Sequence, residues 1–251
     1  MATLRFIFSV PHCGATLRAF VFSSNSRIGV TLTYILPFVV YLVGTLFASR
    51  FEGEAYAIAY SVVAIAVAVV ISVLLAKHKA FSVHWKVHWG VIFGLLGIGL
   101  WIFICQLDLE KQLSVFLPKF LQPESRVAFN PLEALTDRWA QVGFLIARLA
   151  GIAVLVPIAE ELFWRGFLLR WLIDPEYDKI KIGEFTPSSC AIVTLMFTLA
   201  HPEWFAAAIY CLLINGLLYW KKDLWLCIVA HGTSNLALAI YVLLTGTWEL
   251  W

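Results

Sequence analysis

Charged residues are scarce in this chain. Of its 251 residues, 18 are Lys or Arg and 16 are Asp or Glu, or 14% together, whereas soluble domains carry about 25%. The formal net charge is only +2, which argues against nucleic acid as a partner. Hydrophobic residues make up 61%, and they gather in runs near the roughly 20 residues that a helix needs to cross a bilayer. We therefore predict an all-α polytopic membrane protein.

Cysteine is also sparse and follows no pattern. The five cysteines are scattered, and no Cys-x-x-Cys pair occurs. Four of them lie in or beside apolar runs, where cysteine usually behaves as a small hydrophobic residue. We expect neither a disulfide framework nor thiolate chemistry. The sequence has no internal repeat either, although many transporters are built from repeated halves.

Seven apolar segments are candidates for membrane spans. In chain order they cover about residues 28–48, 55–76, 87–107, 137–172, 188–200, 203–220 and 224–244. The fourth segment would form a helix of roughly 50 Å at 1.5 Å per residue. Such a helix must be tilted, kinked at Pro157 or broken there into two pieces. An unbroken helix gives about seven spans, and a break gives eight.

The distribution of basic residues divides the chain and favours seven spans. Residues 1–27 form a basic N-terminal arm, 28–107 hold three N-terminal spans, 108–136 form a polar connecting loop, and 137–251 hold the last four spans. A short amphipathic helix is expected near 109–121. The positive-inside rule places the N-terminus inside and the C-terminus outside. Eight spans would place Lys221 and Lys222 outside, so we prefer seven.

Two adjacent carboxylates and an arginine lie within the fourth apolar segment. Ionisable groups at membrane depth are costly, so they face a bundle interior or a wet cavity and usually have a function. Glu161 and Arg165 are four residues apart with the acid nearer the N-terminus, which favours an ion pair on one helix face. Glu160 points about 100° away from Glu161. We interpret Glu161 and Arg165 as structural support and Glu160 as the chemically active acid.

The remaining polar residues at membrane depth complete a candidate site. His201 ends the fifth segment, and His231 and Asn235 lie four residues apart on one face of the seventh. A carboxylate and a histidine, here Glu160 and His201, can hold and deprotonate a water molecule. A histidine and an amide, here His231 and Asn235, can donate to an oxyanion. Phe197, four residues before His201, is expected to pack against it.

The same residues also allow a metal site. Glu160, His201 and His231 match the usual set of three ligands around a catalytic zinc ion with an open fourth position. Asn235 beside His231 looks more like a pair of oxyanion donors than a ligand with its support. We therefore favour a metal-free mechanism and keep a divalent metal such as zinc as the alternative. Both mechanisms give hydrolysis inside a membrane.

Other interpretations of these residues need no catalysis. A single histidine in a span often only bridges two helices, and we interpret Asn215 as a cap or a bridge. The chain could be a membrane scaffold or an immunity protein that keeps the same helix pairing. It could also be a proton-coupled transporter with Glu160 and His201 as a relay. The presence of all the candidate catalytic residues favours an enzyme.

Three motifs occur in order within hydrophobic segments. They are Glu160-Glu161-x-x-x-Arg165, Phe197-x-x-x-His201 and His231-x-x-x-Asn235. Over about residues 140–245 this set resembles the CAAX prenyl protease and bacteriocin-processing family, also called CPBP or Abi. The runs at 160–170 and 248–251 are similar to a bacterial branch associated with exosortase and PEP-CTERM sorting systems.

The resemblance implies an all-helical intramembrane endopeptidase whose protease core lies in residues 137–251. By this resemblance, Glu160 and His201 activate the water, and His231 and Asn235 support the transition state. The implied location is a bacterial inner membrane, and the implied partners are membrane lipids and a membrane-associated protein or peptide substrate. A link to an exosortase system follows from the branch, whereas the resemblance leaves a metal, a prenylated substrate and the cleavage site open.

Overall fold

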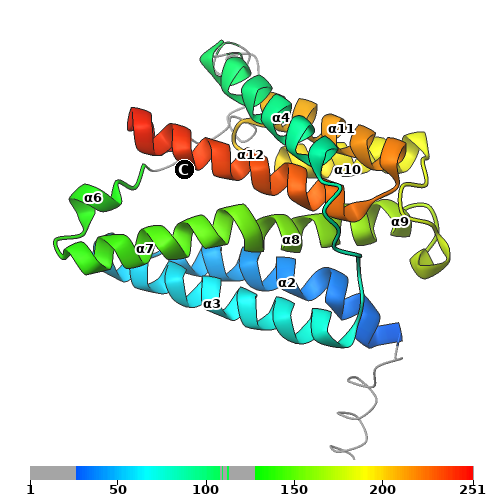
Figure 1. Ribbon diagram of the computed structural model, residues 1–251, viewed down its shortest axis with the longest axis horizontal. Helices are drawn as coiled ribbons and strands as arrows, with labels where there is room; N and C mark the ends of the chain where they lie inside the picture. Colours follow the sequence, from blue (N-terminus) through cyan, green and yellow to red (C-terminus); the bar gives the residue numbers. More distant parts are fainter. Residues whose placement is uncertain (1–26, 108, 110–111, 113–127, 251) are drawn as a thin grey trace, which may run out of the picture.

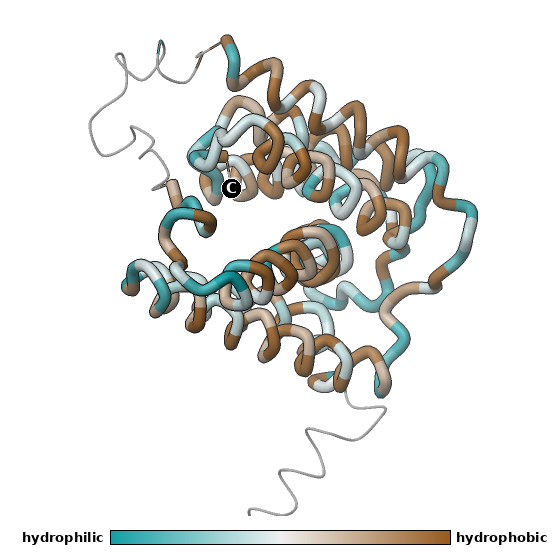
Figure 2. Tube along the Cα trace, turned by 60° about the vertical axis from the view of Figure 1, so that its left-hand side comes forward, coloured by the Kyte–Doolittle hydropathy of each residue, from teal (hydrophilic) through white to brown (hydrophobic). Residues whose placement is uncertain are grey.

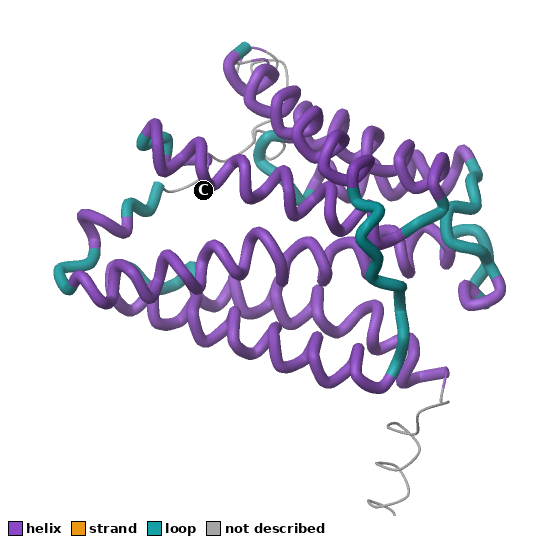
Figure 3. The backbone as a smooth tube through the Cα atoms, viewed as in Figure 1, coloured by secondary structure: helices purple, strands orange, loops and turns teal. Residues whose placement is uncertain are grey.

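The chain is all-helical wherever the structure describes it. The computed structural model describes residues 27–107, 109, 112 and 128–250, and within these ranges it contains helices and no strand (Figure 3). The predicted basic arm, except for Arg27, and most of the amphipathic helix expected at 109–121 lie outside the described residues. The main helices are α2 (Arg27–Ala48), α3 (Gly53–Lys77), α4 (His88–Gln106), α10 (Pro187–Leu199), α11 (Trp204–Lys221) and α12 (Leu224–Thr245).

The fourth predicted segment forms one continuous helix. It comprises α7 (Arg138–Ala150), η2 (Gly151–Leu155), α8 (Val156–Glu161), η3 (Leu162–Leu168) and α9 (Leu169–Trp171), of which η2 and η3 are π-helical. Pro157 therefore does not break the helix, which makes one candidate crossing of 34 residues. The eight-span arrangement required two crossings here, and the structure does not have them.

Six helices in the described ranges are long and apolar enough to cross a membrane. The fifth predicted span, at 188–200, corresponds to α10, which has only 13 residues. At 1.5 Å per residue α10 is about 20 Å long, which is shorter than the roughly 30 Å hydrocarbon core. We infer that α10 does not cross the hydrocarbon core by itself. The turn between α10 and α11, which contains His201, then stays at membrane depth.

Polar side chains fix where several helices begin. Asp137 caps α7, because its Oδ2 accepts a hydrogen bond of 2.7 Å from the Ala140 backbone N–H. Thr186 caps α10, where Pro187 occupies the first turn. Asp223 caps α12. Such side-chain oxygens satisfy backbone donors that the first helical turn leaves unpaired, so the loops join the helices at defined angles.

The long helix α7–α9 lies in the middle of the bundle. Figure 1 shows α2 and α3 on one side of it, and α12 with α4, α10 and α11 on the other. Hydrophobic residues cover most of the helices, and hydrophilic residues gather in the connecting segments (Figure 2). On α3, four apolar side chains at helical spacing are more than half exposed: Ile58, Val62, Ile65 and Val69. This stripe is suited to contact with lipid.

Glycines bring α4 close to α11 and α12. A Cβ atom at Gly94 would lie 2.5 Å from the Ala230 backbone oxygen, and one at Gly90 would lie 2.9 Å from a backbone oxygen of α12. Gly97 lies similarly close to a ring of α11. A Cβ atom at Gly99, by contrast, would have no neighbouring atom within 4 Å. Small residues at such contacts allow two helix backbones to approach.

Candidate active site

The site begins with an irregular stretch of the long helix. In η2 the Val156 backbone N–H bonds to the Gly151 carbonyl, five residues earlier, as in a π-helix. A second π-helical stretch, η3, follows α8. Glu160 and Glu161 thus lie in a short α-helical segment between two π-helical ones. Such irregular turns are frequent at functional sites.

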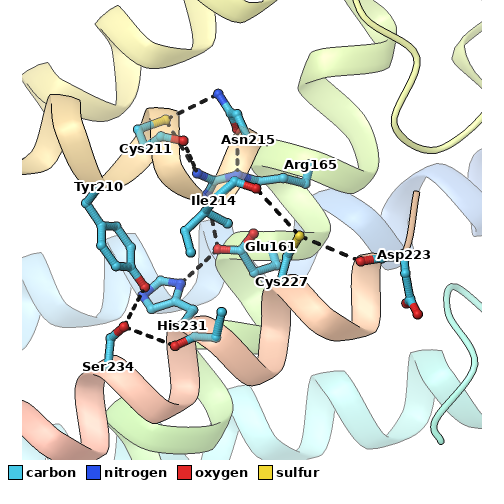
Figure 4. A network of polar contacts seen from close by, with 11 residues as sticks. Glu161, Arg165, Tyr210, Cys211, Ile214, Asn215, Asp223, Cys227, His231 and Ser234 are labelled. Carbon is cyan, nitrogen blue, oxygen red and sulfur yellow. Dashed lines mark hydrogen bonds and ion pairs between the residues drawn. The ribbon is translucent and has the colours of Figure 1, made fainter. Parts of the chain in front are cut away.

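The Glu161 carboxylate accepts hydrogen bonds from side chains on two different helices. Its Oε1 accepts a hydrogen bond of 3.0 Å from Nη1 of Arg165 and one of 2.8 Å from Nδ1 of His231. Both Glu161 and Arg165 are fully buried. The ion pair expected from the spacing is present, and the bond to His231 adds α12 to it. The carboxylate therefore connects the long helix to α12 (Figure 4).

Arg165 is held by α11 as well as by Glu161. Its Nε donates to Oδ1 of Asn215 at 3.0 Å, and its Nη2 lies 3.5 Å from the Cys211 carbonyl. The guanidinium also lies 5.2 Å from the ring centre of Phe197. Figure 4 shows this network between α11, α12 and the long helix. Because the partners come from several elements, the arginine fixes their relative positions.

Glu160 has a different environment from that of its neighbour. Its side chain is 8% exposed and lines a cavity, and its Oε2 atom is buried without a hydrogen-bond partner. A buried polar atom with no partner costs free energy, so it needs a ligand, a water molecule or a function. Oε2 of Glu161 lacks a partner too, but Glu161 accepts two hydrogen bonds at Oε1 and does not line the cavity. Glu160 is therefore the carboxylate that faces the cavity.

His201 follows α10, in the turn that leads into α11. Its Nδ1 lies 2.8 Å from the Phe197 carbonyl oxygen, and the two rings stack with centres 4.4 Å apart. A carbonyl can only accept, so Nδ1 carries a proton and Nε2 is the acceptor in the neutral ring. Packing on Phe197 and the edge of Trp101 at 5.9 Å orients the imidazole.

His231, on α12, is oriented in a similar way. A carboxylate oxygen only accepts, so the Nδ1 facing Glu161 carries a proton. Tyr210 lies edge-on to the ring at 5.9 Å, and its hydroxyl donates to Oγ of Ser234 at 3.0 Å. Ser234 in turn lies 2.8 Å from the Gly94 carbonyl of α4. Four helices therefore determine how this imidazole is placed.

Asn235 contacts the irregular part of the long helix. Its Nδ2 donates to the Ile152 carbonyl oxygen at 2.8 Å. This bond uses one of the two N–H groups on that nitrogen. The second N–H belongs to a side chain that lines the same cavity as Glu160.

One cavity brings the candidate residues together. Its volume is about 150 Å³, and its wall includes Glu160, His201, His231 and Asn235. One water needs roughly 10–15 Å³ of such space, so the cavity has room for several water molecules. Arg148 and Glu203 also line it. Polar residues that are far apart in the sequence thus face one space that has room for water.

The three candidate metal ligands share this cavity without forming a ready ligand set. In the described part of the chain, no three His, Cys, Asp or Glu side chains lie close enough together to hold one metal ion. Nδ1 of each histidine is already hydrogen-bonded, so only Nε2 of each ring would serve as a ligand. A metal centre would require these side chains to move toward one another.

Several residues of the site were not identified from the sequence. Asn215, interpreted as a cap or a bridge and left out of the candidate site, does bridge α11 to the long helix, because it binds the Arg165 guanidinium. Tyr210 and Ser234 were given no role, although they border His231. The i, i+4 spacing reveals partners on one helix, whereas these contacts join different helices. A polar side chain in an apolar run, such as Asn215, was the one available signal.

The comparison with known families agrees with this geometry. Residues 142–237 match the family model described as type II CAAX prenyl endopeptidase Rce1-like. The matched range contains all three motifs and both π-helical stretches. No curated protein matches the chain, and neither does any solved structure. The chain is an integral membrane protein, and its residues 142–237 are similar to the Rce1-like type II CAAX prenyl endopeptidases, a family of hydrolases.

Proposed function

We propose that this protein is an intramembrane endopeptidase that hydrolyses a peptide bond near the C-terminus of a membrane-associated protein or peptide. The observation that carries the proposal is the shared cavity of Glu160, His201, His231 and Asn235. These groups come from three parts of the chain, and together they offer a base, two imidazoles and an amide donor. That set suits hydrolysis better than it suits a purely structural contact.

The water is activated by Glu160 and His201. The Glu160 carboxylate accepts one water proton while the water oxygen attacks the carbonyl carbon. Nε2 of His201 accepts a hydrogen bond from the other water hydrogen, because its Nδ1 proton is committed to the Phe197 carbonyl. Glu160 then gives its proton to the leaving amine as the C–N bond breaks. The base is regenerated, and no external reactant besides water is required.

The oxyanion is stabilised from the α12 side. The second N–H of Asn235 donates to the developing negative charge. His231 donates from Nε2 when both ring nitrogens carry a proton, and its Nδ1–H is held by the Glu161 carboxylate. Fixed donors of this kind act strongly in a site with little water around them. No step in this scheme uses a metal ion, and zinc held by Glu160, His201 and His231 is the alternative.

A cleavage assay with two probe peptides tests the proposal. The purified protein is placed in lipid vesicles with a farnesylated peptide that ends in a CAAX box, or with the same peptide lacking the lipid. Products are identified by mass spectrometry. We expect cleavage of at least one probe, and a loss of at least about 100-fold in Glu160→Gln and in His201→Ala, as expected when a general base is removed.

The control for both variants is the folded state. Each must insert and keep its elution volume and its midpoint of thermal unfolding. A folded Glu160→Gln variant that cleaves at the wild-type rate contradicts the proposal. A wild-type protein that cleaves neither probe, yet retains a bound membrane partner, favours the scaffold interpretation.

The biological setting follows from the resemblance to the exosortase-associated branch. We propose a bacterial inner-membrane location and a substrate that belongs to such a sorting system. An exosortase gene next to the gene for this protein supports this assignment. A neighbourhood without any sorting gene, in several related genomes, opposes it.

A further inference from the structure

Pro157 changes the hydrogen bonding of the long helix at a defined point. Proline has no backbone N–H. In the π-helical pattern of η2, residue 157 would donate to Ile152, and in the α-helical pattern it would donate to Ala153. The Val156 N–H, the other helical donor near Ile152, is already bonded to Gly151. The proline therefore removes the donor of the Ile152 carbonyl in the π-helical pattern, or that of the Ala153 carbonyl in the α-helical pattern.

Helix α12 meets both of these carbonyls. Asn235 donates from Nδ2 to the Ile152 oxygen at 2.8 Å. Three residues earlier, a Cβ atom at Gly232 would lie 2.6 Å from the Ala153 oxygen, so only glycine lets the backbone of α12 lie so close. Asn235 and Gly232, on one face of α12, therefore lie against the two carbonyls whose helical donor Pro157 can remove.

The same turn of the helix decides where Glu160 points. Arg148, Ile152, Val156 and Glu160 are spaced by four residues, and all four line the cavity. In a regular α-helix each step of four residues drifts by about 40°, so Glu160 would lie roughly 120° away from Arg148. The wider π-helical turn between them offsets part of this drift. Glu160 therefore faces the cavity because residues 151–155 are π-helical.

We propose that Asn235 is a positioning residue for Glu160: its amide supplies the hydrogen-bond donor that Pro157 lacks, and this bond holds the π-helical turn in the register that directs Glu160 into the cavity. The effect on catalysis rests on the function proposed above. The bond itself does not, since it is a contact between two helices. Asn235 then has two tasks, one for each N–H of its amide.

A second-site rescue separates this positioning task from oxyanion binding. Pro157→Ala restores a backbone N–H five residues after Ile152. We expect Pro157→Ala to change the turnover of the otherwise unaltered protein by less than about twofold. In the Asn235→Ala background it should raise kcat about tenfold with KM unchanged, the factor typical of one buried backbone hydrogen bond. Full activity should not return, because the second amide N–H is still missing.

The matched control is the same proline substitution in a His231→Ala background. His231 has no bond to the long helix at Ile152, so Pro157→Ala should not raise kcat there. Pro157→Leu, which also restores the N–H, guards against an effect specific to alanine. The assay uses whichever probe peptide the wild-type protein cleaves, and the loss of activity in Glu160→Gln tests the proposed function independently.

A stability measurement tests the bond without any substrate. Asn235→Ala should lower the midpoint of thermal unfolding and speed hydrogen exchange at residues 150–156, and Pro157→Ala should reverse both changes. The proposal is overturned if Pro157→Ala and Pro157→Leu alter the Asn235→Ala variant no more than they alter the wild-type protein, in kcat or in exchange. It is also overturned if His231→Ala is rescued equally.

Discussion

Replacing each of the two adjacent glutamates by glutamine should give two different defects. The side chains are neighbours in sequence and the change is nearly isosteric, so the pair controls for position and shape. Glu161 is fully buried and accepts hydrogen bonds from Arg165 and His231. Oε2 lacks a hydrogen-bond partner in both residues, so the difference between them lies in the two bonds at Glu161 Oε1. Their contributions to folding should therefore differ, although both are acids in one membrane helix.

The expected loss of stability in Glu161→Gln comes from Arg165. Removing one charge of a buried ion pair typically costs about 3–5 kcal/mol, because the other charge stays buried without compensation. At about 2–4 °C per kcal/mol for a chain of this size, the midpoint of unfolding should fall by roughly 6–20 °C. Asn215 and the Cys211 carbonyl still bind the guanidinium, which favours the lower part of this range.

Glu160→Gln should leave the midpoint of unfolding within about 2 °C of wild type, since no observed contact is lost. Peptide cleavage should nevertheless fall by at least about 100-fold, because the general base is gone. Thermal unfolding in detergent, followed by tryptophan fluorescence, gives the first quantity, and the probe-peptide assay gives the second. Equal decreases in stability for the two variants would refute the division between a structural and a chemical acid.

Three further predictions concern helix packing, topology and the metal. Gly94→Ala should lower the midpoint of unfolding by several degrees, because its Cβ would lie 2.5 Å from the Ala230 backbone oxygen. Gly99→Ala is the matched control, since there is open space around Gly99. Equal effects of the two variants would contradict the packing argument. A cysteine at position 221 should react with an impermeant reagent only from the cytoplasmic side, and reaction from outside would refute the predicted orientation. A strong chelator should leave most of the cleavage activity. The metal-dependent scheme would be established if the protein holds zinc, if removing the zinc stops cleavage, and if His231→Ala loses the zinc.

The sequence predicted the helices well and their irregularities poorly. The expected segments at 55–76 and 137–172 correspond to Gly53–Lys77 and Arg138–Trp171. Hydrophobic runs fix such boundaries because lipid-facing helices must be apolar over their whole length. The π-helical turns were not foreseen. Pro157 signalled a disturbance, but its outcome depends on α12, whose distance from the long helix is not encoded in local spacing.

The residues of the candidate site could be chosen from the sequence, whereas their contacts with other helices could not. Glu160, His201, His231 and Asn235 were chosen because polar groups are rare in membrane helices, and they line one cavity. The bond between Glu161 and His231 was not predicted, although it links two residues that were both singled out. Spacing within one helix identifies an i, i+4 pair such as Glu161 and Arg165, whereas contacts across helices depend on rotation and depth. Those two quantities come from the packed structure.

The network around Arg165 also constrains the order in which the protein can be assembled during synthesis. Glu161 is made four residues before Arg165 and on the same helix, so the charge has a partner from the moment this segment folds. Asn215 and His231 are translated later. The segment can therefore leave the insertion machinery with Arg165 already paired, and α10 and α11 and then α12 dock onto this pair. A chain whose arginine had to wait for α11 would expose a bare cation to lipid.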